Sequence, residues 1–327
     1  MGQPILVGYD PRTKDRAPVR LGVVVARLTE APLIVASVQA AVQASVGPRP
    51  IGITPPQQLP YAIVQPDPDL LHDCAPQVEE IRLELEPYGI QASCEVLIGT
   101  SAAKALHEAA EDRRAGLLVV GSSRRGARGR VLAGATAARL LSGSPCPVAV
   151  APHGWERHEL PTTIGVAFRD TEDGREALRG ALALARRAHA RLRVVTVVEE
   201  GLRAALESDT YRAGRAGKSV EDVIGEHELS ARRAAEKALA ELEGQRQVEA
   251  EIESWVGDPV DVLVRLSEHF DLLVCGSRGY GPVRAVLLGA VSRRIVTEAR
   301  CPVTVVPRGR ESRLESLIAE SRATAHA

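Results

Sequence analysis

Aromatic residues make up only 3% of this 327-residue chain, and the sequence contains a single methionine. Its hydrophobic core must therefore be built from Val, Leu, Ile and Ala. Net charge is also nearly absent, because 41 basic residues stand against 42 acidic ones and leave a formal charge of −1. This balance excludes a global polycation that binds nucleic acid through charge alone.

The sequence has no apolar run that approaches the length of a membrane-spanning helix. Its first residues, MGQPILVGYD, lack a basic segment before an apolar one and do not resemble a secretory signal. The five cysteines form an odd number without CxxC spacing, and no two histidines have HxxxH spacing. We therefore expect reduced thiols, no metal site, no membrane segment and a cytoplasmic protein.

The dominant feature of the sequence is an internal repeat. LLVVG at 117–121 matches LLVCG at 272–276, and PCPVAVAP at 145–152 matches RCPVTVVP at 300–307. Three pairs of residues share one offset of 155 positions: Gly121 and Gly276, Gly134 and Gly289, Cys146 and Cys301. A constant offset over such a stretch indicates a tandem duplication.

Each copy alternates buried-strand patterns with helical periodicity, which predicts an α/β fold with mostly parallel strands covered on both faces. We assign one domain to 1–152 and one to 160–307, with a polar linker at 153–160 and a polar tail at 308–327. The expected strands are 5–10, 33–37, 93–99, 117–121 and 146–150, then 163–168, 192–198, 251–256, 271–276 and 302–307. The expected helices include 17–28, 72–86, about 100–113 and one from about 283.

Two local signals refine this outline. Asp258 followed by Pro259 supplies an N-cap and a proline at the first helical position, so a helix should begin there. Seven prolines between positions 48 and 68 exclude regular structure and predict a long loop.

The glycine-rich segment after the strand at 271–276 is the main candidate for ligand binding, because open α/β sheets bind ligands beyond the carboxyl ends of their strands. Gly276, Gly279 and Gly281 could direct backbone N–H groups at a phosphate, although a plain strand-to-helix turn explains the same residues. Pro282 occupies the lysine position of a P-loop, and no GxGxxG follows either first strand. Kinase-type P-loop and Rossmann dinucleotide sites are therefore excluded.

The pattern Gly276-x2-Gly279-x9-Gly289, preceded by GDP at 257–259 and followed by CPVTVV at 301–306, resembles the universal stress protein family in two tandem copies. The resemblance implies an open, twisted, five-stranded α/β sandwich of the adenine nucleotide alpha hydrolase-like type for each copy. It also implies binding of ATP or another adenine nucleotide, with or without Mg²⁺. ATP-binding members use an Asp after the first strand, a Val in the second, the glycine loop and nearby hydroxyls.

Carried over by position, the resemblance gives the second copy the binding residues Gly276, Gly279, Gly281, Gly289, Ala290, Val291, Ser292, Val197 and Asp170. Two departures stand out in this copy. Ala290 replaces the Ser or Thr expected directly after Gly289. The Asp of the first strand aligns without a gap to Arg169, one position before Asp170.

The first copy carries over Asp10, Val38, Gly121, Gly134 and Thr136. It has Arg124 at the second glycine, and Ala135 and Ala137 where hydroxyls are expected. We therefore expect the second copy to be the better nucleotide site. The arginines near Arg124 fit either a phosphate clamp or a solvated face.

The terminal strands 146–150 and 301–305 would be exposed edges if each copy stood alone. The resemblance implies that such strands pair across a dimer interface, so we predict an intrachain pseudo-dimer; a homodimer through other faces stays open. The sequence shows no nucleophile with an adjacent base. We predict adenine-nucleotide binding without dedicated catalysis, with a nucleotide-independent scaffold or a weak ATPase as alternatives.

Overall fold

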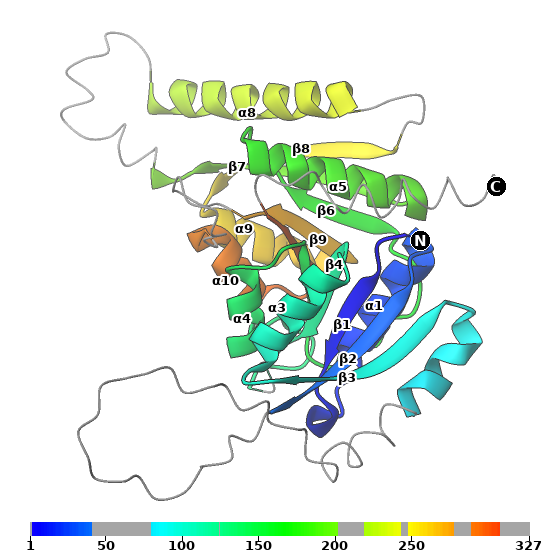
Figure 1. The fold of residues 1–327 in the computed structure, drawn as a ribbon. Coiled ribbons are helices and arrows are strands. Elements are labelled where there is room, and N and C mark those ends of the chain that lie inside the picture. Colours follow the sequence, from blue (N-terminus) through cyan, green and yellow to red (C-terminus); the bar gives the residue numbers. More distant parts are fainter. Residues whose placement is uncertain are drawn as a thin grey trace, which may run out of the picture.

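The computed structural model describes residues 2–40, 80–123, 125–201, 219–242, 248–277 and 289–307 (Figure 1). The strands of the first copy are β1 (Ile5–Tyr9), β2 (Leu33–Ala40), β3 (Ala92–Gly99), β4 (Leu117–Gly121) and β5 (Val148–Ala151). Those of the second copy are β6 (Thr163–Ala167), β7 (Arg191–Glu199), β8 (Ala250–Gly257), β9 (Leu272–Gly276) and β10 (Val303–Val306). All ten therefore overlap strands expected from the sequence.

Among the described residues, the α-helices with both ends described are α1 (Ala17–Thr29), α3 (Ala102–Asp112), α4 (Ala135–Leu141), α5 (Glu172–Ala188), α8 (Val220–Leu242), α9 (Pro259–Leu266) and α10 (Ala290–Glu298). Residues 80–85 are also helical and overlap the helix expected over 72–86, of which 72–79 lie outside the described residues. Short 3-10 helices lie at Pro11–Thr13, Glu86–Tyr88 and Ser267–His269. The cap expected at the start of α9 is present, since the Asp258 carboxylate accepts from Val260 N at 2.7 Å and Asp261 N at 3.2 Å. The proline-rich segment and the tail at 308–327 lie outside the described residues. The helix expected from about 283 is described from Ala290 on, as α10, and 283–288 lie outside the described residues.

One ten-stranded sheet runs through both copies, in the order β3-β2-β1-β4-β5-β10-β9-β6-β7-β8. Each copy contributes five parallel strands, and the two sets meet at an antiparallel pair, β5 with β10. There Val150 lies opposite Val303, and Val148 opposite Val305. The pairing predicted between the two terminal strands is thus present, and it removes an exposed edge from each copy.

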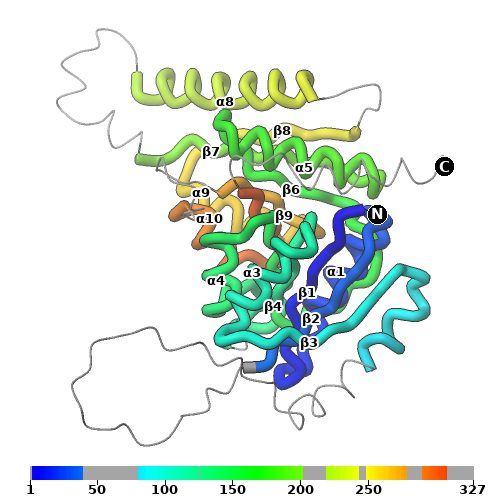
Figure 2. Tube along the Cα trace, viewed as in Figure 1, coloured from blue at the N-terminus to red at the C-terminus, as the bar shows by residue number. Residues whose placement is uncertain are grey.

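Helices cover both faces of this sheet, and two hydrophobic clusters mark the two layers. α1, α5 and α8 contribute to one cluster, whereas α3, α4, α9 and α10 contribute to the other (Figures 1 and 2). Successive strand residues alternate between the clusters: Val7 belongs to the first and Leu6 to the second. Strands buried on both faces explain the continuous apolar runs of the sequence.

The two copies also touch through both helical layers. On one face, α1 packs against α5, and Arg187 Nε donates to the carbonyl oxygen of Leu28 at 2.9 Å. On the other, the backbone N–H of Val131, in the loop before α4, donates to the carbonyl oxygen of Ala299 at 2.7 Å. Each copy therefore holds backbone of the other in place.

Candidate functional site

A cleft of about 310 Å³ opens in the first copy beyond the carboxyl ends of β1, β2 and β4. The first turn of α4 and residues of the neighbouring helix α3 also line it. All five residues predicted for this copy line the cleft: Asp10, Val38, Gly121, Gly134 and Thr136. The structure therefore brings these residues together in one cavity.

Carboxylates shape the mouth of this cleft. Asp10 caps the short 3-10 helix that follows it, accepting from the backbone N–H of Arg12 at 3.1 Å and from its Nε at 2.9 Å. Asp15 accepts from Ala17 N at 3.0 Å and from Gly154 N at 3.3 Å. Both carboxylates hold the backbone of the loop, and Asp10 remains half-exposed to the cleft.

The opposite end of the cleft suits an anion. α4 begins directly after Gly134, whose extended backbone offers no side-chain cap to the helix. Residues of the first turn, including Thr136, line the cleft, and N–H groups in the first turn of a helix have no partner within the helix. Ser122 is already engaged, since its hydroxyl donates to the carbonyl oxygen of Ala151 at 2.7 Å and accepts from Leu132 N at 3.2 Å.

The register of the sheet fixes which residues of the two copies are equivalent. Leu117 and Leu272 are equivalent residues of the repeat. Ile5 of β1 pairs with Leu117, and Ile164 of β6 pairs with Leu272, so Ile5 and Ile164 are equivalent as well. Counting along both strands places Asp10 in register with Arg169. The second strands, aligned in the same way on β1 and β6, place Val38 in register with Val197.

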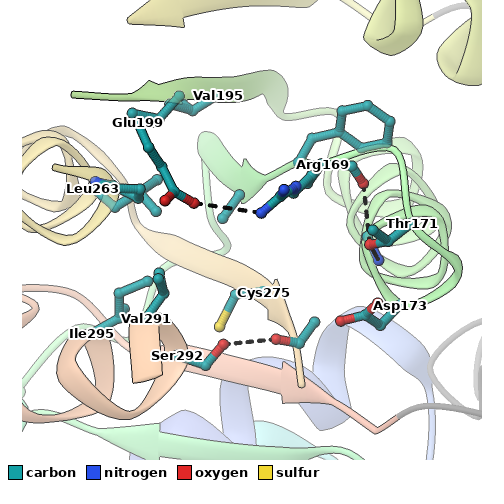
Figure 3. A pocket seen from close by; sticks show the side chains of 16 residues that line it. Arg169, Thr171, Asp173, Val195, Glu199, Leu263, Cys275, Val291, Ser292 and Ile295 are labelled. Carbon is teal, nitrogen blue, oxygen red and sulfur yellow. Dashed lines mark hydrogen bonds and ion pairs between the residues drawn. The ribbon is translucent and has the colours of Figure 1, made fainter. Parts of the chain in front are cut away.

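The equivalent cleft of the second copy measures only about 90 Å³ (Figure 3). Arg169 and Glu199 extend towards one another across it, and the guanidinium lies 3.4 Å from the carboxylate. Asp170 does not line this cleft, because its carboxylate accepts from Arg175 Nε at 2.7 Å. An arginine thus stands at the position where the first copy presents a carboxylate.

Four other predicted residues of this copy line the cleft: Gly276, Val197, Val291 and Ser292. Gly289 and Ala290 form the N-cap and first residue of α10 but are not among the described lining residues. Gly279 and Gly281 lie outside the described residues. The Ser292 hydroxyl, expected as a phosphate donor, is buried and donates to the carbonyl oxygen of Gly276 at 2.8 Å.

The thiol of Cys275 points to the same cleft, close to Ser292 (Figure 3). Burial raises the pKa of this thiol to about 12, and the hydrogen bond with Ser292 offsets only part of that effect. The group is protonated at neutral pH, so it is no nucleophile. Within the described residues, no three His, Cys, Asp or Glu side chains gather as a metal site would require.

The model of the universal stress protein family matches residues 1–152 and 161–307 of this chain. The chain belongs to the universal stress protein family. A family member from Mycolicibacterium smegmatis is 30% identical over 312 residues, covering 92% of this chain and 96% of the relative. A universal stress protein of Mycobacterium tuberculosis (strain ATCC 25618 / H37Rv) is 28% identical over 221 residues, which cover 67% of this chain and 73% of the relative.

Solved structures of this family have the same fold. A universal stress protein of Pseudomonas aeruginosa UCBPP-PA14 superposes with a TM-score of 0.64 at 14% identity, over 100% of this chain and 98% of its own. A universal stress protein of Archaeoglobus fulgidus superposes with a TM-score of 0.61 at 20% identity, over 94% of this chain and 98% of its own. Tandem α/β domains are therefore a shared architecture.

Sequence reasoning missed the ion pair across the second cleft. Its only signal was the ungapped alignment of Arg169 with the expected aspartate, and the partner, Glu199, lies 30 positions away.

In the first copy, Arg125 and Arg130 are exposed and Arg128 pairs with Glu156 of the linker. Of the described helices, none combines the length and the apolar character that crossing a membrane requires.

Proposed function

We propose that this universal stress protein binds an adenine nucleotide, ATP in particular, in the cleft of the first copy. The observation that supports this most is the contrast between the two clefts. The first has about 310 Å³ and an aspartate at its mouth, whereas the second has about 90 Å³ and an arginine paired with Glu199. This proposal reverses the ranking expected from the sequence, which rests on Gly279 and Gly281.

The lining of the first cleft offers separate surfaces for the base, for the polar groups of the nucleoside and for the phosphates. Ala36, Val38 and Val120 offer small apolar surfaces on which the flat face of a base can lie. The half-exposed Asp10 carboxylate can accept hydrogen bonds from amino or hydroxyl groups of a nucleoside. The phosphates would then reach the start of α4, where N–H groups and helix dipole favour negative charge.

Catalysis has less support than binding. A hydrolase needs a base within hydrogen-bond reach of a water molecule. The carboxylates at the mouth already have partners, Arg12 for Asp10 and backbone N–H groups for Asp15. Because no acidic cluster surrounds the cleft in the described residues, Mg²⁺ would enter bound to the phosphates. A weak ATPase therefore remains the second candidate.

Calorimetric titration of ATP into the full chain tests this proposal. Replacing Asp10 with Ala should weaken ATP binding about 10- to 100-fold, the usual effect of losing a hydrogen bond to a charged group. Arg169→Ala, at the equivalent position of the second copy, is the matched control and should leave the affinity within about twofold.

Two other outcomes would contradict the proposal. Loss of affinity in Arg169→Ala but not in Asp10→Ala would move the site to the second copy. If the wild type binds no ATP, and the purified protein releases no nucleotide on denaturation, the nucleotide-independent scaffold becomes the better account.

A further inference from the structure

The loop that precedes α4 contains a short segment, residues 131–133, which we call the bridge segment. It lies between two parts of the wall of the first cleft, because Ser122 and Ser123 precede it and Gly134 follows it. Its middle residue, Leu132, binds within its own copy. The carbonyl oxygen of Leu132 accepts from Ser123 N at 2.7 Å, and its N–H donates to the Ser122 hydroxyl at 3.2 Å. The middle of the bridge segment is thus tied to the wall of the first cleft.

The two outer residues of the bridge segment bind the second copy instead. Val131 N donates to the carbonyl oxygen of Ala299 at 2.7 Å, and Ala133 N donates to that of Val296 at 2.9 Å. Both acceptors lie at the carboxyl end of α10, where the carbonyl groups of a helix have no partner within it. The bridge segment therefore caps α10 while it also forms hydrogen bonds with the wall of the first cleft.

The contact between the bridge segment and α10 is buried. Val131 and Ala299 are fully buried, and Val296 is 1% exposed, so water cannot replace a lost donor there without opening the contact. The helix cannot supply the donor either. Arg300, four positions after Val296, donates its N–H to the hydroxyl of Ser267 at 2.9 Å. The bridge segment and α10 therefore fix each other in position.

The bridge segment also sets where α4 begins. Ala133 is directly followed by Gly134, whose extended backbone starts α4 and lines the first cleft. An earlier part of the loop is anchored to the linker: Gly129 N donates to the carbonyl oxygen of His153 at 2.8 Å, and His153 N donates to that of Arg130 at 3.1 Å. The hydrogen bond from Ala133 N to α10 is the anchor next to the start of α4.

We propose that the second copy positions the phosphate end of the first cleft, through α10 and the bridge segment. This inference rests on the proposed function, ATP binding in the first copy. The surface for the base, at Ala36, Val38 and Val120, belongs to strands of the first copy itself and does not depend on α10. α10 also lines the second cleft through Val291 and Ile295, so one helix contributes to both clefts. The second copy thereby takes part in binding although its own cleft is small.

Titrating ATP and adenosine into the full chain separates the phosphate end of the cleft from the base end. Ala133→Pro removes the N–H that donates to Val296 and should weaken ATP binding about fivefold or more, the effect of one lost hydrogen bond. Adenosine has no phosphate, so its affinity should stay within about twofold of the wild type. A general loss of folded structure would weaken both ligands equally.

Ala127→Pro is the matched control. Ala127 is an exposed residue of the same loop, and its N–H donates to no backbone carbonyl in the described part of the chain. The variant should therefore leave the affinities for ATP and adenosine within about twofold of the wild type.

Hydrogen exchange of the wild type tests the same coupling without a substitution, so it decides the matter if Ala133→Pro does not fold. Coupling between two sites is reciprocal, and ATP bound at the start of α4 should strengthen the contact with α10. ATP should slow amide exchange about fivefold both at 131–133 and at 295–299 in the second copy. Adenosine should leave exchange at 295–299 unchanged.

Three results would overturn the inference while leaving ATP binding intact. These are unchanged ATP affinity in Ala133→Pro, equal weakening of ATP and adenosine in that variant, or no slowing of exchange at 295–299 when ATP binds the wild type. If the wild type binds no ATP, the proposed function fails and this inference falls with it.

Discussion

Replacing Gly174 with Ala should destabilise the protein by about 3 kcal/mol, at the upper end for overpacking a tight contact. Gly174 lies in the first turn of α5, and a Cβ built there would overlap the carbonyl oxygen of Arg169. That oxygen belongs to the backbone and accepts from Thr171 N at 2.7 Å, so it cannot move aside as a flexible side chain would. The start of α5 must shift instead.

Urea unfolding of Gly174→Ala and of a matched variant, Gly225→Ala, measures this effect. Gly225 lies within α8, and no atom within 4 Å would meet its added Cβ. Ala is the better helix former, so Gly225→Ala should stabilise the protein by up to about 1 kcal/mol. Equal effects of the two variants would show that α5 does not approach the strand ends as closely as described.

Replacing Val150 with Asp should cost about 3–5 kcal/mol, the range for an uncompensated buried charge. Val150 is fully buried and lies opposite Val303 in the antiparallel pair that joins the two copies. The added carboxylate would meet only apolar neighbours from both copies. The loss should therefore weaken the whole ten-stranded sheet and not only one domain.

The control for this prediction is Ile98→Asp on β3, an outer strand of the same sheet, where the side chain is 42% exposed. Surface substitutions of this kind usually change stability by less than about 0.5 kcal/mol. The comparison uses the denaturant midpoints of the two variants, with the slope of the unfolding free energy against denaturant concentration unchanged. Equal stability of Val150→Asp and Ile98→Asp would mean that the copies do not depend on the β5–β10 pair.

Features that repeat in the sequence were the ones that could be predicted from it. The repeat identified the two terminal strands, the family resemblance implied that they pair as β5 and β10 do, and apolar runs marked the strands. The cap at Asp258 depends on neighbouring residues alone, so its local signal was sufficient. Asp10 and Val38 were named by the family resemblance, and because they follow or belong to parallel strands, both line the cleft at the carboxyl ends of those strands.

Features that depend on distant partners could not be predicted. Asp170 was a candidate ligand by proximity in sequence, but Arg175 on α5 draws its carboxylate away from the cleft. The Ser292 hydroxyl was expected to be available, yet the carbonyl of Gly276 accepts its hydrogen. The sequence also could not show that Arg169 and Glu199 would meet across a cleft of only about 90 Å³.

The central claim, that the first copy holds the nucleotide, is tested most directly by ATP titration of two variants at one equivalent position. Val38 and Val197 occupy the same place in the second strand of each copy, and each lines its own cleft. Val38→Phe should fill the first cleft and weaken ATP binding at least about tenfold, or about 1.4 kcal/mol. Val197→Phe should leave the affinity within about twofold, and the opposite pattern would contradict the claim.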